Sequence, residues 1–88
     1  MSARETLLEF PCQFPIKVMG KNTENFDAIV LEIIRRHVGD IQDGAITRRP
    51  SKEGSYTSVT VMIEATSLEQ LDAIYQSLTD SPDVLMAL

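Results

Sequence analysis

The clearest element of the sequence runs from Glu24 to His37, with the residues ENFDAIVLEIIRRH. Its apolar side chains recur three and four positions apart, which places them in one stripe on a helix: Phe26, Ile29, Val30, Ile33 and Ile34. Burying this stripe contributes on the order of 10 kcal/mol before conformational entropy is subtracted. The pattern predicts a helix that packs on a sheet, capped by Asn22 or Thr23 and ended by Gly39.

Two stretches with period-two alternation lie on either side of this helix, at residues 13–19 and 56–65. Alternation of this kind predicts strands with one buried face. Because Pro15 has no N–H group, we expect it at the start of its strand or on an unpaired side. Weaker patterns predict further strands at residues 45–49 and 84–88.

A second helix is expected to begin at about Leu68, since Ser67 and Gln70 have the spacing of a capping box. The predicted order of elements is therefore β-α-β-β-α-β. This order is typical of the α+β ferredoxin-like (split βαβ) fold. With right-handed crossovers it gives a four-stranded antiparallel sheet of order 4-1-3-2 with two helices on one face.

The domain organisation is simple, because 88 residues leave room for one hydrophobic core. We expect a single domain over residues 10–88, preceded by a mobile N-terminal arm over residues 1–9. An apolar patch lies where the arm meets the domain, at Leu7, Leu8 and Phe10.

Charge and composition disfavour several classes of function. The net charge is −5, which opposes the phosphate backbone, so nucleic acid is not expected as a partner. A single cysteine does not support the disulfide framework of a small secreted domain, and no apolar run has the length of a membrane span or a signal peptide. These features predict a cytoplasmic protein with no membrane contact.

Catalytic and metal-binding residues are not expected. His37 is the only histidine and Cys12 the only cysteine, and neither has a neighbour in sequence that would activate it. We expect helix capping by His37 and apolar packing by Cys12. The carboxylates are scattered along the chain, so neither a metal nor a cofactor is expected.

Three groups of residues are candidates for binding. Gly20, Lys21 and Asn22 precede the first helix, where an anion would meet its N-terminus, although a plain turn is the simpler interpretation. A basic spot is predicted on the hairpin loop and the strand before it, formed by Arg48, Arg49 and Lys52.

The third group, Met19 and Met62, is predicted on the side of the sheet that the helices leave open. Methionine suits adaptable interfaces, so this side is expected to bind a partner, to be covered by the arm, or simply to face solvent. Tyr56 is the only aromatic residue predicted there, which disfavours RNA recognition by base stacking.

Three segments together resemble the YbeD-like family of small bacterial proteins, a domain of unknown function. They are LLEFP at residues 7–11, KVMG at residues 17–20 and PSKEGSYTSV at residues 50–59. The resemblance extends from Leu7 to Leu88 and implies a βαββαβ fold similar to the ACT domain. It carries over no catalytic residues, and some members of the family are described as lipoate-related regulatory proteins.

These observations predict a non-enzymatic, ACT-like binding or regulatory module. It would act through contacts with an unknown protein partner or with a small anionic metabolite, as a monomer or weak homodimer. The alternative is an accessory protein or minor enzyme of lipoate or acyl-group metabolism, in which case turnover would depend on His37 or Cys12.

Overall fold

The computed structural model describes residues 9–88, apart from the side chain of Asp43. The expectation of a mobile arm, including Leu7 and Leu8, falls mainly outside these residues. Phe10 is described, and it packs partly buried against the core. The elements, in chain order, are β1 (Cys12–Lys21), α2 (Phe26–Val38), the short 3-10 helix η1 (Asp43–Ala45), β2 (Ile46–Pro50), β3 (Tyr56–Ala65), α3 (Leu68–Asp80) and β4 (Val84–Ala87).

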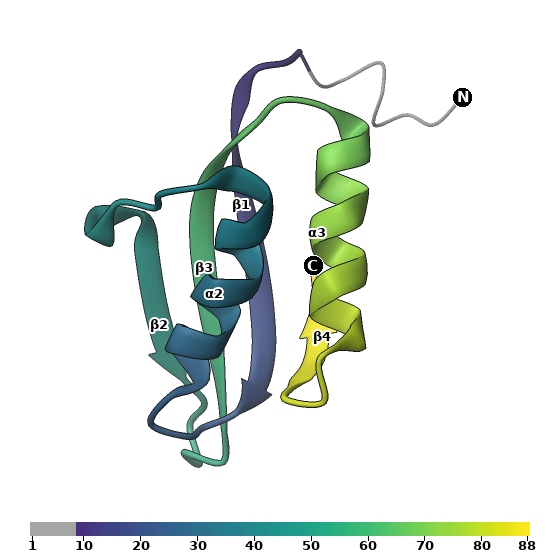
Figure 1. The fold of residues 1–88 in the computed structure, drawn as a ribbon. Helices are drawn as coiled ribbons and strands as arrows, with labels where there is room; N and C mark the ends of the chain where they lie inside the picture. The colour runs from purple at the N-terminus through teal and green to yellow at the C-terminus, as the bar shows by residue number, and fades with distance from the viewer. Residues whose placement is uncertain (1–8) are drawn as a thin grey trace.

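The four strands form one antiparallel sheet in the order β2-β3-β1-β4. This is the predicted order 4-1-3-2 in reverse, so the expected topology is confirmed. Both helices lie on the same side of the sheet, and no other helix or strand of residues 9–88 covers the opposite side (Figure 1). The two strands with the strongest alternation, β1 and β3, occupy the centre and pair along ten positions.

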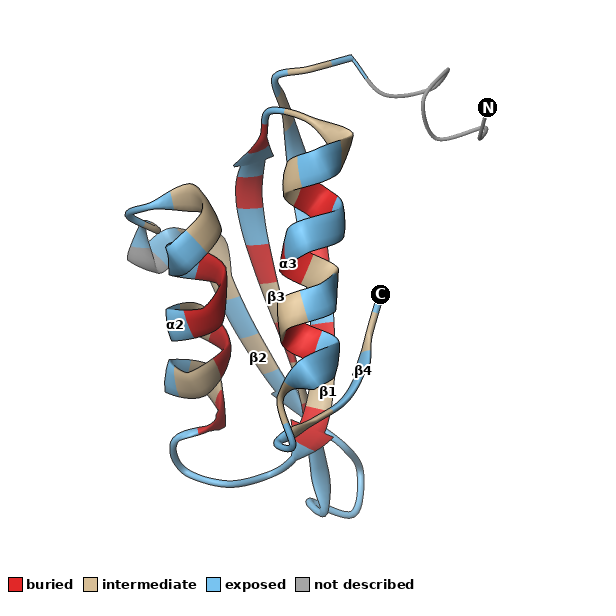
Figure 2. Ribbon diagram, turned by 45° about the vertical axis from the view of Figure 1, so that its right-hand side comes forward, coloured by how far each residue is buried: buried red, intermediate tan, exposed pale blue. Residues whose placement is uncertain are grey.

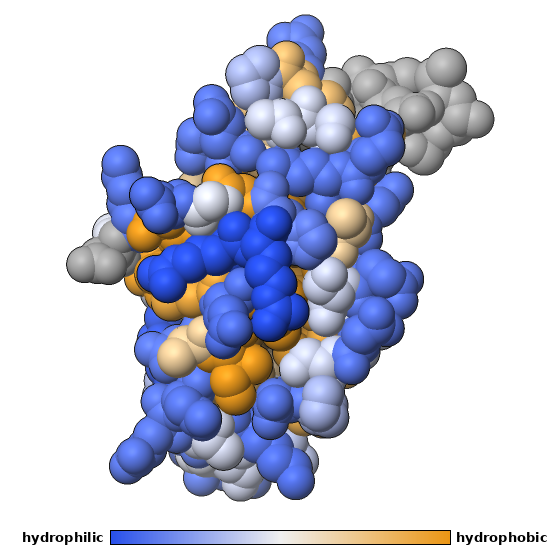
Figure 3. All heavy atoms as spheres, viewed as in Figure 1, coloured by the Kyte–Doolittle hydropathy of each residue, from blue (hydrophilic) through white to orange (hydrophobic). Residues whose placement is uncertain are grey.

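The core lies between the sheet and the helices. On α2 and α3 the buried residues face the strands, while exposed residues face outward (Figure 2). The fully buried side chains come from every element that the alternation and the helical stripes identified, with the largest being Phe26, Ile16, Ile34, Leu71, Ile74 and Leu78. The helix side of the molecule is mostly hydrophilic, with apolar residues showing mainly in its middle (Figure 3).

Strand β1 is longer than predicted and includes Gly20 and Lys21, which were expected in a turn. The reason is its partner, because β3 supplies pairing positions as far as Lys21↔Tyr56. The expected helix cap was also wrong. Helix α2 begins after Asn25, which makes no side-chain capping bond, and the Asn22 amide donates instead to the carbonyl of Gly54 at 2.9 Å.

Two local predictions are confirmed by the structure. The Ser67 hydroxyl accepts a hydrogen bond from the Gln70 amide, and the Gln70 side chain accepts one in return from the amide of Thr66. Gly39 ends α2 with a positive φ of 80°, a conformation that glycine adopts at little cost.

Gly20 is required by a close approach of other groups to its backbone. A Cβ atom at this position would lie 2.3 Å from Cε1 of Phe26 and 2.5 Å from the carbonyl oxygen of Asp83. Glycine therefore lets the first residue of α2 pack directly on β1, which closes the lower end of the core. In Figure 1 this is the end at which β4 joins the sheet.

Pro15 occupies an unpaired side of its strand, as predicted. The amide of Lys17 donates to Leu88, which shows that Lys17 and alternate residues of β1 direct their backbone groups towards β4. Because β4 does not extend as far as Pro15, the missing N–H group interrupts no hydrogen bond of the ladder. Within residues 9–88, no helix has the length and apolar character needed to cross a bilayer.

Candidate functional site

The open face of the sheet, on the side away from the helices, collects the polar members of each alternating pattern. The registers of β1, β2 and β3 place one row of side chains across three strands, Thr47, Thr60 and Lys17, because Thr60 pairs with both of the others. In the next row, Arg49 lies opposite Ser58. These five residues line a shallow hollow with a volume of about 260 Å³. We call them the cation–hydroxyl cluster.

The two cations of the cation–hydroxyl cluster have no counter-ion of their own. Lys17 and Arg49 are both exposed, and neither forms an ion pair with any residue in the described range. The Ser58 hydroxyl donates its proton to the carbonyl of Arg49 at 3.4 Å, whereas the hydroxyls of Thr47 and Thr60 line the same hollow as possible donors. The cluster therefore offers positive charge and hydrogen-bond donors to a negatively charged group.

Apolar residues also lie on the open face, outside the cation–hydroxyl cluster. Met19 pairs with Met86, and Met62 lies opposite Pro15. The side chains of Met62, Leu85, Met86 and Leu88 are 40–60% exposed. The expectation that Met19 and Met62 share this face is confirmed, although the row containing Lys17 separates them.

Arg48 and Arg49 are adjacent in β2 but serve different faces. Arg48 lies on the helix side, where its guanidinium donates to the Asn22 side chain at 2.7 Å, to the carbonyl of Thr23 at 2.6 Å and to the Asp27 carboxylate at 3.2 Å. These bonds tie β2 to the loop that leads into α2. Arg48 therefore acts as an internal clamp and does not join Arg49 in a basic spot.

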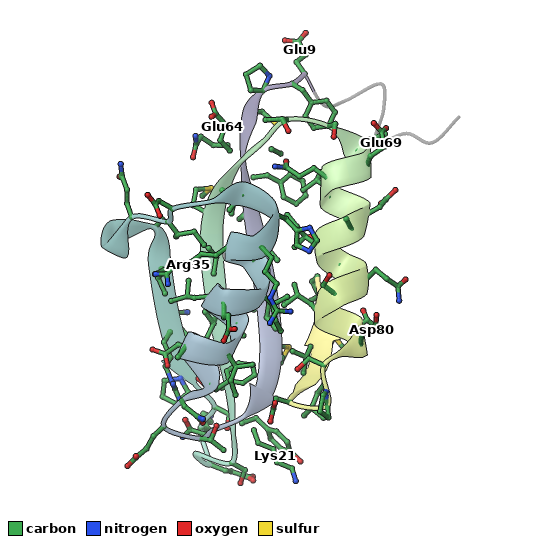
Figure 4. All side chains as sticks on the ribbon, viewed as in Figure 1. Glu9, Lys21, Arg35, Glu64, Glu69 and Asp80 are labelled. Carbon is green, nitrogen blue, oxygen red and sulfur yellow. The ribbon has the colours of Figure 1, made fainter. Side chains whose placement is uncertain are left out.

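The other residues of the predicted loop site are dispersed. Gly20 is buried, whereas Lys21 is exposed at the lower end of β1 and points into solvent (Figure 4). Asn22 is engaged by Gly54 and by the Arg48 clamp. Lys52 is exposed in the β2–β3 loop. An anion site at Gly20, Lys21 and Asn22 therefore stays a prediction, as does the contribution of Lys52 to a basic spot.

His37 forms a contact that the sequence did not suggest. Its Nε2 atom lies 2.9 Å from the Ser77 hydroxyl, which joins the C-terminal end of α2 to the last turn of α3. A serine next to an imidazole is also the start of a nucleophile–base pair. Ser77, however, lies inside α3, where backbone N–H groups bond to carbonyls four residues earlier and are not free to stabilise an oxyanion. The pair is best explained as a tether between the helices.

Cys12 begins β1, is partly buried and packs against the core, as expected for a small apolar residue. Over the described range, His, Cys, Asp and Glu side chains form no group of three with the geometry of a metal site.

Sequence reasoning did not identify Thr47, Ser58 and Thr60 as binding residues, and it did not select Lys17. The alternation does place all four on the open face. What it does not provide is the register that puts residues of three strands side by side. That register follows from pairings such as Lys17↔Thr60 and Arg49↔Ser58.

The fold matches that of the ACT domain. The chain superimposes on the ACT domain from GTP pyrophosphokinase of Chlorobium tepidum with a TM-score of 0.65 and 16% identity, covering 86% of this chain and 94% of that one. It is also similar to the solution structure of protein HP0495 from H. pylori, with a TM-score of 0.70 and 17% identity over 92% of this chain and 85% of that one.

Sequence comparison then identifies the family. Residues 5–88 match the family model described as "Protein of unknown function (DUF493)". A UPF0250 protein of Nitrosomonas europaea is 46% identical over 96% of this chain and 97% of its own length. One of Paraburkholderia phytofirmans is 44% identical over 99% and 98%. The chain belongs to this DUF493 (UPF0250) family, which confirms the YbeD-like resemblance.

Proposed function

We propose that this protein is a non-enzymatic binding or regulatory module that holds a small anionic ligand in the cation–hydroxyl cluster. The observation that carries the proposal is that Lys17 and Arg49, both without an ion-pair partner in the described chain, border the same 260 Å³ hollow as three hydroxyls. Charged donors form the strongest hydrogen bonds to carboxylate and phosphate oxygens. A guanidinium adds a planar pair of donors to this arrangement.

The negative charge of the rest of the molecule supports the assignment of the anion site to this one group of cations. The chain has a net charge of −5, so its overall field repels anions. An anion is therefore held only where cations gather locally. Two of the other cations are paired with carboxylates, Arg36 with Glu32 and Arg48 with Asp27, whereas Lys17 and Arg49 lie side by side on the open face without such a partner in the described chain.

The absence of turnover is part of the proposal and rests on the same five residues. Ammonium, guanidinium and hydroxyl groups are donors near neutral pH, and none of them accepts a proton readily without a neighbouring base. No carboxylate or histidine borders this hollow. The arrangement supports recognition of a ligand rather than its conversion.

The proposal is tested by following backbone amides by NMR while inorganic phosphate, and then small mono- and dicarboxylates, are titrated into the full chain. We expect saturable shifts centred on Lys17, Ser58 and Thr60. Arg49→Gln and Lys17→Gln should each weaken the affinity about tenfold, the loss expected for one charge-assisted hydrogen bond of about 1.4 kcal/mol. Lys52→Gln is the matched control, because it removes the same charge from an exposed loop.

Two outcomes would refute this proposal. An equal loss of affinity with Lys52→Gln would show attraction by unspecific charge alone, and shifts confined to another surface would place the ligand elsewhere. Cys12→Ala and His37→Ala should leave the affinity within about twofold, because neither residue borders the hollow. Turnover of any ligand that either substitution abolished would replace the binding module with an enzyme.

A further inference from the structure

The upper half of β3 has an edge without a strand partner. Strand β3 pairs with β1 along its full length, from Tyr56 to Ala65. On its other edge, the register with β2 ends at Ile46↔Val61. Within the described chain, residues 62–65 therefore have no strand beside them on that edge. Figure 1 shows β3 continuing upward past the start of β2.

The backbone groups on this edge point outward and are suited to pairing. The amide of Ser51 donates to the carbonyl of Tyr56 at 2.8 Å, which makes these two residues a hydrogen-bonded pair of the β2–β3 ladder. In an antiparallel ladder every second residue repeats this orientation. Every second residue of β3, counted from Tyr56, includes Met62 and Glu64. The backbone N–H and C=O groups of these two residues therefore point away from β1, towards the open edge. An open edge of this kind is a template for another strand.

A cavity of about 420 Å³ lies along the same edge. Apolar side chains such as Val38, Ile41 and Ile63 share its lining with polar ones, among them the carboxylates of Asp40 and Glu64. Figure 4 shows Glu64 at the upper end of β3, directed away from α3. The open edge therefore has space beside it for added chain, beyond the point where η1 contacts β3.

Charge indicates which chain would fit. Neither Asp40 nor Glu64 forms an ion pair with another described residue. A second copy of this protein carries the same net charge of −5, so two copies repel each other at long range. A peptide with lysine or arginine would instead be attracted. The edge is therefore complementary to a basic extended segment.

We propose that an extended peptide from a partner protein, with basic and apolar residues in alternation, adds to β3 at residues 62–65, antiparallel and in line with β2. Strand addition of this kind takes its affinity from backbone hydrogen bonds and its specificity from alternate side chains. Thr47 and Arg49, which occupy the hydrogen-bonding phase of β2, face the open side. The basic residues of the peptide occupy the positions equivalent to Thr47 and Arg49. There they form hydrogen bonds with the backbone of Glu64 and lie beside its carboxylate. The apolar residues then face Ile41 and Ile63.

The test uses a capped hexapeptide of alternating lysine and valine, titrated into the full chain and followed by NMR. Saturable shifts are expected in residues 62–66 and 38–45, with slower hydrogen exchange of the Glu64 amide. N-methylation of the lysine amides should weaken binding at least tenfold, since those N–H groups face β3. N-methylation of the valine amides should change the affinity less than threefold, because those groups face solvent.

Variants of the protein test the charge argument separately. Glu64→Lys should weaken binding at least tenfold, whereas Glu69→Lys, on the outer face of α3, should change it less than threefold. Equal losses from the two methylated peptides would overturn strand addition, as would an absence of saturable binding at millimolar peptide. Equal losses from Glu64→Lys and Glu69→Lys would overturn the assigned edge. None of these results depends on the cation–hydroxyl cluster, which lies on other residues.

Discussion

The two faces of β3 differ although they belong to the same ten residues. On the helix side, Thr57, Val59, Val61, Ile63 and Ala65 are at most 4% exposed, whereas the alternate residues from Tyr56 to Glu64 are partly or fully exposed. The buried face holds the fold together through apolar packing. The open face carries the candidate ligand site and contributes little burial. Stability and binding are therefore assigned to separate sets of side chains that can be changed independently.

The largest difference is expected between neighbours on β1. Ile16→Ala should lower the free energy of unfolding by about 2–5 kcal/mol, because Ile16 is fully buried and its removal leaves a cavity. Lys17→Ala, one position along and on the open face, should change it by less than about 0.5 kcal/mol. Chemical denaturation of both variants measures this difference. Similar losses of unfolding free energy in the two variants would contradict the assignment of stability and binding to separate faces.

A smaller loss is expected where the backbone itself is packed. Gly20→Ala should cost about 1–3 kcal/mol, since the added methyl group meets the Phe26 ring and a carbonyl that is not free to move. Gly44→Ala is the matched control, with no atom within 4 Å of the added Cβ and an effect expected below about 0.5 kcal/mol. Thermal unfolding of both variants would show the contrast. If Gly20→Ala proved neutral, the close packing of α2 on β1 would be incorrect.

The smallest difference in stability is expected between the two adjacent arginines of β2, one on the helix side of the sheet and one on the open side. Arg48→Met should destabilise the fold by about 1–2 kcal/mol, because it removes the bonds to Asn22, Thr23 and Asp27 while keeping an apolar stem. Arg49→Met should stay within about 0.5 kcal/mol in the same denaturation experiment, since its cation has no ion-pair partner among the described residues. Equal effects of the two substitutions would contradict the assignment of Arg48 as a clamp.

Features that depend on near neighbours were predictable from the sequence. The capping pair Ser67 and Gln70 is three residues apart, and the structure forms the bond from the Gln70 amide to the Ser67 hydroxyl, while the Gln70 side chain accepts from the adjacent amide of Thr66. The expected cap at Asn22 failed for the opposite reason. Its side chain is bound by Arg48, which is 26 positions away, and no local pattern signals a contact over that distance.

The candidate sites show the same limit. Alternation assigned Lys17 and Thr60 to the open face, and the order of elements predicted that their strands are adjacent. The contact between them, and that of Arg49 with Ser58, depends on the register of the pairing. The same is true of the unpaired edge at residues 62–65, which exists because β2 is five residues long and β3 ten.

Local periodicity thus accounts for the elements, their buried faces and the topology of this protein. Packing of the complete sheet decided which side chains meet across strands and where an edge stays open. The physical reason is that a hydrophobic pattern selects a face with a period of two, so any even shift in register satisfies it equally well. Hydrogen bonds between strands, the close contact of Phe26 with Gly20 and the Arg48 clamp select one register among these. They form only when distant segments are already side by side.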